Sequence, residues 1–110
     1  MEVKRMLTQI ESTEQFESAV NGYSPLLVEF FQPWCKYCQA FFPTLEEFAA
    51  QGTIPVIQVS GEEFPQIFDA YGVDSYPTLI VFRGGQPFAK HAGSMPMEEL
   101  QNWVEEALQA

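Results

Sequence analysis

The chain has 110 residues, of which 46% are hydrophobic, 15% aromatic and 18% charged. This composition predicts one folded domain over residues 1–110, and it excludes a disordered tail, a collagen-like chain and a small scaffold held together by disulfides. Fifteen acidic against five basic residues give a formal charge of −10, which repels phosphate backbones, so nucleic acid is not expected as a partner.

No part of the chain predicts membrane insertion or export. The apolar runs fall well short of the roughly 20 residues that a membrane-spanning helix needs. Lys4 and Arg5 resemble the basic start of a secretory signal, but polar residues follow directly after Leu7, where such a signal carries an apolar stretch of about 7–15 residues. We therefore expect no membrane association and a reducing compartment, most simply the cytoplasm.

The first part of the chain alternates between strand and helix signals. Residues 3–10 have weak strand character. Ser12 or Thr13 then begins a predicted helix, because either side chain can cap a helix N-terminus, and Gly22 ends it. Residues 26–31 form a nearly continuous apolar run, which is typical of a strand with helices on both of its faces.

The middle of the chain predicts a long helix, a strand and a short helix. Apolar residues recur at helical spacing over 41–49, and this helix is expected to end at Gly52. Pro43 lies inside the pattern and is expected to kink the helix. Residues 54–59 predict the next strand, and residues 64–70 predict a short helix with a proline near its start.

Two strands and a helix complete the predicted fold. Strands over 78–82 and 88–91 flank the Gly-Gly pair at 84–85, which is a typical hairpin turn. Ser94 is expected to cap the last helix, with Pro96 in its first turn. The order β-α-β-α-β-α-β-β-α predicts an α/β fold, in which a central mixed sheet is flanked by helices on both faces.

Cys35 and Cys38 are the two cysteines of the chain. A disulfide that closes so short a loop constrains the unfolded chain very little, so the pair suits chemistry better than stabilisation. It lies where the strand over 26–31 gives way to the long helix. A helix N-terminus stabilises a thiolate through its free N–H groups and its dipole, and Lys36 adds a positive charge. The spacing places an attacking and a resolving sulfur on one side of the first turn.

Several segments around this pair resemble the thioredoxin family. A Cys-x-x-Cys motif alone also occurs in zinc sites, but the combination of segments is specific. The resemblance implies a thioredoxin fold, with a central sheet and four helices, in which the peptide bond Tyr76–Pro77 is cis and lies beside the cysteines. It covers roughly residues 3–108 and rests on Phe-Phe-Gln-Pro-Trp-Cys-Lys-Tyr-Cys at 30–38, Pro43, Tyr-Gly-Val-Asp-Ser-Tyr-Pro-Thr-Leu at 71–79 and Phe-Arg-Gly-Gly at 82–85.

The resemblance implies catalytic roles for three residues. Cys35 resembles the exposed nucleophile of the family, and Cys38 resembles its more buried resolving thiol. Glu29 stands where family members carry a buried acid, so we expect burial to raise its pKa and its carboxylate to accept the proton of Cys38. Gln58 stands where many thioredoxins have a lysine that pairs with this acid. We expect the loss of that partner to raise the proton affinity of Glu29 further.

The resemblance also implies a site for a substrate peptide. Trp34, Tyr76 and Pro77 would flank the incoming peptide, and Gly93 would lie near the same groove. Tyr76 is bulkier than the aliphatic residue that usually precedes this proline, so the fit of a substrate is expected to differ. The dipeptide between the cysteines is Lys-Tyr, which matches neither typical thioredoxins nor disulfide isomerases.

These assignments predict a thiol–disulfide oxidoreductase that reduces or exchanges disulfides in protein substrates. No bound cofactor or metal is expected, and the resemblance implies a flavin-dependent reductase as electron donor. One alternative is a non-catalytic module of the same fold that docks a partner. Another is a zinc site, although a structural zinc needs four ligands and the chain adds only His91 to the cysteines. Single residues also have simpler interpretations: Lys36 as a solvated side chain, Glu29 as a solvent-facing residue, and Trp34, Tyr37 and Tyr76 as ordinary packing.

The groups around Cys35 predict a redox potential. Because the helix N-terminus and Lys36 favour the thiolate, they favour the reduced form of the pair. We expect a potential above the roughly −270 mV of a typical thioredoxin, measured by equilibrating the protein with glutathione buffers. A potential at or below that value would contradict the prediction.

Overall fold

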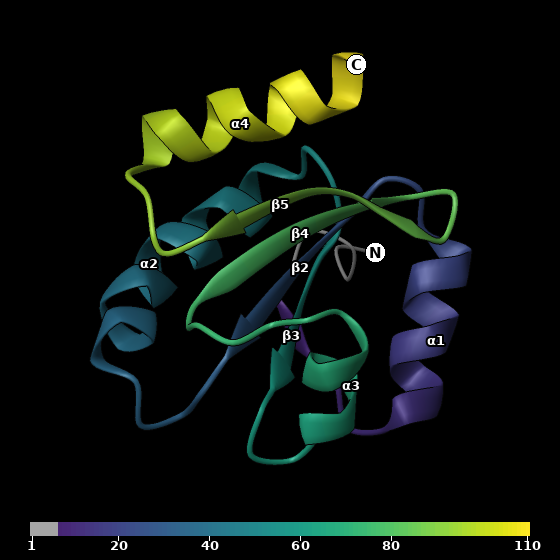
Figure 1. Cartoon of the computed structure of the whole chain (residues 1–110). Coiled ribbons are helices and arrows are strands. Elements are labelled where there is room, and N and C mark those ends of the chain that lie inside the picture. The colour runs from purple at the N-terminus through teal and green to yellow at the C-terminus, as the bar shows by residue number, and fades with distance from the viewer. Residues whose placement is uncertain (1–6) are drawn as a thin grey trace.

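The structure is a computed structural model that describes residues 7–110. Within this range the strands and helices follow one another in the predicted order (Figure 1). No helix of this part of the chain is long and apolar enough to cross a membrane. The elements are β1 Thr8–Gln9, α1 Thr13–Gly22, β2 Leu26–Phe31, α2 Lys36–Gln51, β3 Val56–Ser60, α3 Pro65–Ala70, β4 Thr78–Arg83, β5 Gln86–Ala92 and α4 Met97–Gln109.

The strands form one five-stranded sheet in the order β1-β3-β2-β4-β5. β2 lies at its centre, parallel to β3 and antiparallel to β4, so the sheet is mixed. Side chains of α1 and α3 pack in the apolar cluster on one face, and side chains of α2 and α4 pack in the cluster on the other (Figure 1). The predicted α/β class and the helices on both faces of the sheet are confirmed.

Two predicted elements differ in extent. The strand predicted over 3–10 is seen at Thr8–Gln9, and residues 3–6 lie outside the described part of the chain. The helix α2 begins directly after Cys35 and continues through Pro43 to its end. A proline costs a helix one backbone hydrogen bond, and the apolar face of α2 around it offsets this cost by packing on the sheet.

Of the two predictions for the C-terminal part, the hairpin is found and the start of the last helix differs. The hairpin between β4 and β5 is confirmed, and its glycines at 84 and 85 have φ of 60° and 79°, the left-handed values that a tight turn between twisted strands requires. The prediction that Ser94 caps the last helix was wrong. Pro96 is the N-cap residue of α4, with extended backbone at φ −64° and ψ 161°, and the helix begins at Met97.

β2 presents its side chains alternately to the two helical layers. Val28 and Phe30 are buried in the cluster that α1 and α3 cover, and Leu27 is buried in the cluster that α2 covers. Because side chains alternate along a strand, Glu29 shares the face of Leu27 and lies beneath α2. Glu29 is 1% exposed, so the alternative that it faces solvent was wrong.

A series of aromatic contacts connects the core to the loop before β4. Ring centroids lie 5.2 Å apart between Phe30 and Phe68, 5.7 Å apart between Phe68 and Tyr76, and 5.9 Å apart between Tyr76 and Trp34. Edge-on and tilted aromatic pairs of this kind each add about 0.5–1.5 kcal/mol beyond burial. The central strand therefore fixes the position of a loop that is distant in sequence.

Gly61 follows β3 and lies against the loop that follows β2. Its N–H donates to the carbonyl oxygen of Phe31 at 2.9 Å. A Cβ at this position would collide with the side-chain amide of Gln32 and would lie 2.8 Å from Cε2 of Phe68. The Gln32 amide is the end of a flexible side chain, but the ring of Phe68 is buried in the apolar core and has little space to move into.

We therefore expect Gly61→Ala to lower the free energy of unfolding by about 1–3 kcal/mol, as overpacked core positions do. Urea unfolding measures the change. Gly22→Ala is the control, because no atom lies within 4 Å of a Cβ there, and alanine in a helix is expected to stabilise by about 0.4–1 kcal/mol. Equal stability of the Gly61→Ala variant and the unsubstituted protein would contradict this account of the loop.

Candidate active site

Cys35 lies at the junction between β2 and α2 and is the N-cap residue of the helix. Its backbone is extended, at φ −82° and ψ 119°. Its Sγ accepts the backbone N–H of Cys38 at 3.1 Å, so a sulfur takes the place that a hydroxyl or carboxylate oxygen takes at most helix N-termini. The free N–H groups of the helix therefore lie at the sulfur, as the position of the cysteines in the sequence predicted.

The Tyr76–Pro77 peptide bond is cis and lies beside Cys35, as the resemblance implied. The Cys35 thiol lies 3.7 Å from the carbonyl oxygen of Tyr76, to which it donates. Gly93 has a φ of 101° and donates its N–H to the carbonyl oxygen of Pro77 at 2.7 Å. Trp34 packs edge-on against Tyr76 and remains 62% exposed. The fold thus brings together the residues that were expected to flank a substrate.

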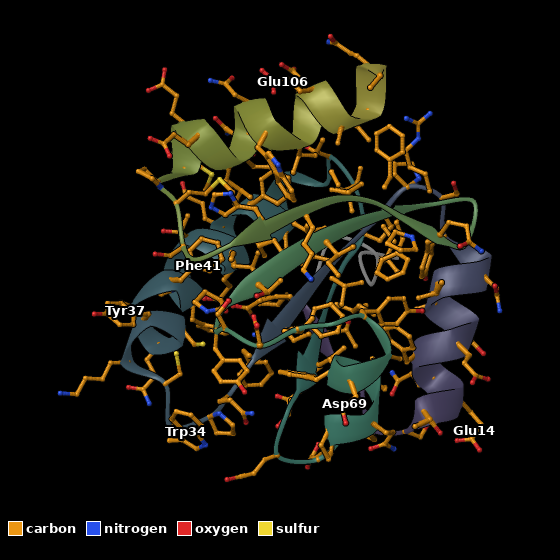
Figure 2. All side chains as sticks on the ribbon, viewed as in Figure 1. Glu14, Trp34, Tyr37, Phe41, Asp69 and Glu106 are labelled. Atoms are coloured by element: carbon orange, nitrogen blue, oxygen red, sulfur yellow. The ribbon has the colours of Figure 1, made fainter. Side chains whose placement is uncertain are left out.

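The prediction that Cys35 is exposed was wrong, because its exposure is only 6%. Cys38 is 5% exposed, so the two cysteines differ little in burial. Cys35 is covered because its sulfur lies between the first turn of α2 and the Tyr76 carbonyl. The exposed side chains near it include two aromatic residues, Trp34 and Tyr37, and Tyr37 reaches 73% exposure. Both Tyr37 and Trp34 project outward at this end of the molecule (Figure 2).

Glu29 is a buried acid with a raised pKa, as predicted. Burial raises its pKa from 4.5 to about 7, and a hydrogen bond from Gln58 opposes the shift. Gln58 Nε2 donates to Glu29 Oε1 at 2.8 Å, because the two residues stand side by side in the register of β2 and β3. The hydrogen bond from Gln58 was not predicted, and it offsets part of the rise in pKa that was expected from the loss of the lysine. A neutral amide takes the place of a cation.

Cys38 holds its proton tightly in the reduced protein. Burial raises its pKa to about 12, and the hydrogen bond and the charge of Cys35 and the charge of Glu29 raise it as well, whereas the backbone at Gln32 lowers it. Glu29 and Cys38 line the same small cavity. The first turn of α2 thus places the Cys35 sulfur at the Tyr76 carbonyl and Cys38 at the cavity that contains the buried carboxylate.

Two further predictions concern charge and metal binding. Lys36 is exposed on the first turn of α2, and its effect on the Cys35 thiol stays a prediction. Within residues 7–110, no three side chains of histidine, cysteine, aspartate or glutamate form a group that could hold a metal ion. His91 lies on β5 with its ring 5.9 Å from that of Trp103, so it packs against an aromatic side chain.

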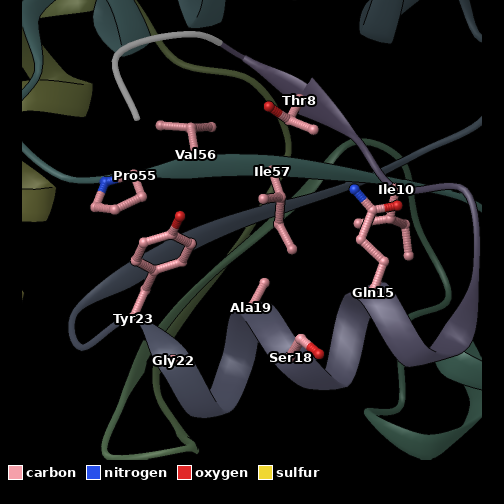
Figure 3. Close-up of a pocket in the computed structure, with 10 residues that line it drawn as sticks. All are labelled: Thr8, Ile10, Gln15, Ser18, Ala19, Gly22, Tyr23, Pro55, Val56 and Ile57. Carbon is pink, nitrogen blue, oxygen red and sulfur yellow. The ribbon is translucent and has the colours of Figure 1, made fainter. Parts of the chain in front are cut away.

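Two hollows in the surface differ in their chemistry. One, of about 150 Å³, reaches Glu29, Cys38 and Gln58. A larger one, of about 490 Å³, lies between α1 and the sheet edge formed by β1 and β3 (Figure 3), and neither a cysteine nor a carboxylate lines it. Of these two hollows, only the one beside the first turns of α2 therefore contains a thiol and a carboxylate.

Comparison with known proteins agrees with this geometry. The family model described as Thioredoxin matches residues 7–106. The chain belongs to the thioredoxin family. It is 40% identical to Thioredoxin 1 of Nostoc sp. over 102 aligned residues, and this alignment covers 91% of this chain and 95% of that protein. It is 36% identical over 96 residues to a thioredoxin of Alicyclobacillus acidocaldarius, covering 86% of this chain and 91% of that protein.

The solved structure of a mutant thioredoxin from Halobacterium salinarum superimposes with a TM-score of 0.88 at 23% identity, over 94% of this chain and 92% of that one. This similarity confirms the thioredoxin fold. The family, the named relatives and the cysteine pair at the expected site support a thiol–disulfide oxidoreductase that acts on disulfide substrates.

Sequence reasoning missed two features of this family member. The Gln39 side chain donates to the carbonyl oxygen of Pro33 at 2.9 Å and ties α2 to the loop before it. The Ser24–Pro25 bond before β2 is also cis. Neither has a local signal, because a glutamine after a cysteine and a serine before a proline are both compatible with many other arrangements.

Glu29 makes the stability of this thioredoxin depend on pH. Its pKa is about 7 in the folded chain against an ordinary 4.5, so the folded state binds the proton more tightly than the unfolded state. The resulting stabilisation is complete below the unfolded pKa and is lost as pH rises from 4.5 to about 7. It corresponds to about 3 kcal/mol.

Glu29→Gln keeps an acceptor for Gln58 and removes the titration. We compare the free energy of unfolding of this variant with that of the unsubstituted protein in urea titrations at several pH values. From about pH 4 to about pH 8, the difference is expected to change by about 3 kcal/mol in favour of the variant, because only the unsubstituted protein loses stability when Glu29 ionises. Glu47→Gln, on the exposed side of α2, is the matched control and is expected to show no such change. The same pH dependence with and without Glu29 would contradict the assignment.

Proposed function

We propose that this protein reduces disulfides of protein substrates through Cys35 and Cys38 in a reducing compartment such as the cytoplasm, and so serves electron transport and redox homeostasis. The contact between the Cys35 sulfur and the Cys38 N–H carries the proposal. It directs the positive end of the α2 dipole at the atom that has to be ionised to attack a disulfide. The proposed docking face for the substrate consists of Tyr76, whose carbonyl contacts the Cys35 thiol, Trp34, which packs on Tyr76, and the hydrogen-bonded pair Pro77 and Gly93.

In the first step, the Cys35 thiolate attacks one sulfur of the substrate disulfide. The substrate S–S bond breaks, a mixed disulfide forms between Cys35 and the substrate, and the other substrate sulfur leaves as a thiolate. The edge-on contact of Trp34 with Tyr76 keeps two aromatic rings beside the reacting sulfur, where they can pack on substrate side chains.

In the second step, Cys38 resolves the mixed disulfide. In the mixed disulfide Cys35 carries neither a proton nor a charge. Its hydrogen bond and its charge, which both raise the pKa of Cys38 in the reduced protein, are therefore lost. The Glu29 carboxylate takes the Cys38 proton, and the resulting thiolate attacks the Cys35 sulfur. The Cys35–Cys38 disulfide forms, the second substrate sulfur leaves as a thiolate, and two electrons have passed to the substrate.

The oxidised pair has to be reduced before another turnover. We propose a flavin-dependent reductase as the electron donor, in keeping with the family resemblance. The flavin would belong to that partner, because both electrons enter this chain as a thiolate attack on its disulfide. The chain itself then needs no bound cofactor.

Reduction of insulin by dithiothreitol tests the proposal. The protein is expected to accelerate the precipitation of insulin chains, and Cys35→Ser is expected to abolish the acceleration because no attacking thiolate remains. Cys38→Ser is expected to accumulate a mixed disulfide that mass spectrometry detects. Glu29→Gln is expected to slow turnover about 10²-fold through the loss of the general base, with Glu47→Gln as the unaffected control.

A Cys35→Ser variant that accelerates insulin reduction as well as the unsubstituted protein would overturn the proposal. The result would favour the alternative, a non-catalytic module of the same fold that docks a partner. The exposed aromatic residues Trp34 and Tyr37 would then serve as its contact surface.

A further inference from the structure

The cavity of about 150 Å³ lies on the inner side of the cysteine pair, and its lining includes Cys38 but no residue of the docking face. Its rim consists of the exposed residues Gln9 on β1, Pro33 before α2, and Gln39 and Phe42 on α2. The docking face and the lining of this cavity therefore share no residue.

The floor of the cavity is buried and polar. It is formed by Glu29, Cys38 and Gln58, and the first two are the titratable residues of its lining. Gln58 occupies Oε1 of the carboxylate, which leaves Oε2 for a second partner. A polar cavity of this volume accommodates several water molecules, and the side-chain amides around it supply donors and acceptors for them.

We propose that this cavity is the route by which the proton that Glu29 takes from Cys38 leaves to solvent, and that Phe42 at its rim limits how much water reaches the carboxylate. The inference deepens the proposed function and rests on it. The proton released by Cys38 passes to Glu29, from Glu29 to a water in the cavity, and from there to bulk solvent. The carboxylate is regenerated while the substrate still covers Cys35.

Phe42 acts on Glu29 through solvent and is a positioning residue. It lies four positions after Cys38 and so shares its side of α2, and it is 39% exposed. The surroundings of Glu29 contain few charges. Cys38 faces it from α2, the neutral Gln58 from β3, and Leu79 pairs with it on β4. Water is therefore the main variable in the environment of the carboxylate.

The first test is a carbon-13 titration of the Glu29 carboxyl group by nuclear magnetic resonance. Phe42→Ala is expected to lower its pKa by about one unit, because added water reduces the cost of burying the charge. Phe42→Trp is expected to raise it. Phe88→Ala is the control, since Phe88 is 46% exposed on β5 and outside the cavity. Unchanged pKa values in both Phe42 variants would overturn the proposal.

The second test asks whether a molecule bound on the docking face changes the pKa of Glu29. In Cys38→Ser, Cys35 is converted to a mixed disulfide with methanethiol or with a ten-residue peptide chosen to span the docking face, so that only the size of the adduct differs. Glu29 is expected to titrate with the same pKa in both adducts. A higher pKa in the peptide adduct would show that water reaches Glu29 from the docking side, and the proposed route would be wrong.

A kinetic measurement connects the route to the reaction. In a single turnover, the pH of half-maximal release of the reduced substrate is expected to fall in Phe42→Ala by the same amount as the Glu29 pKa. A profile that stays in place while the pKa moves would contradict the route. The two carboxyl titrations do not depend on turnover, so they separate a failure of the route from a failure of the proposed function.

Discussion

The contact between the Cys38 N–H and the Cys35 sulfur is the constraint on which the site depends. A helix can begin only where its first N–H groups find acceptors, and here one acceptor is the reacting atom itself. The sulfur is thereby fixed at the N-terminus of α2, four residues after Phe31 ends β2, the central strand. β2 pairs with β3 on one side and β4 on the other, and a turn that adjoins so well supported a strand has little freedom to move.

A second constraint acts from beneath the helix. The carboxylate of Glu29 occupies an apolar position of the sheet, where an ionised group is costly. Gln58 moderates the cost by one hydrogen bond and adds no charge. A lysine at this position would lower the pKa of Glu29 by direct attraction. With a glutamine, the acid keeps a pKa of about 7, which suits the role of general base that we propose for it, since such a base takes up and releases a proton near neutral pH.

Much of the fold was readable from the sequence because local patterns and tertiary contacts agree. The continuous apolar run of β2 predicted a strand covered on both faces, and strand alternation then places Glu29 beneath α2. The burial of Cys35, the donation by Gln58 and the shift of the last N-cap from Ser94 to Pro96 were not predicted. Each depends on how separate segments meet, and a reading of one segment at a time contains no such information.

In the proposed reaction the two cysteines need opposite surroundings, and the helix between them provides both. Attack on a disulfide would be favoured where a substrate packs on the paired rings of Trp34 and Tyr76 and excludes water. Removal of the Cys38 proton needs a hydrated carboxylate, since a dry acid would keep the proton it receives. Cys35 lies against the cis-proline loop, and Cys38 lies on the cavity that contains Glu29. The three-residue offset along the first turn of α2 thus separates a dry reaction from a wet one.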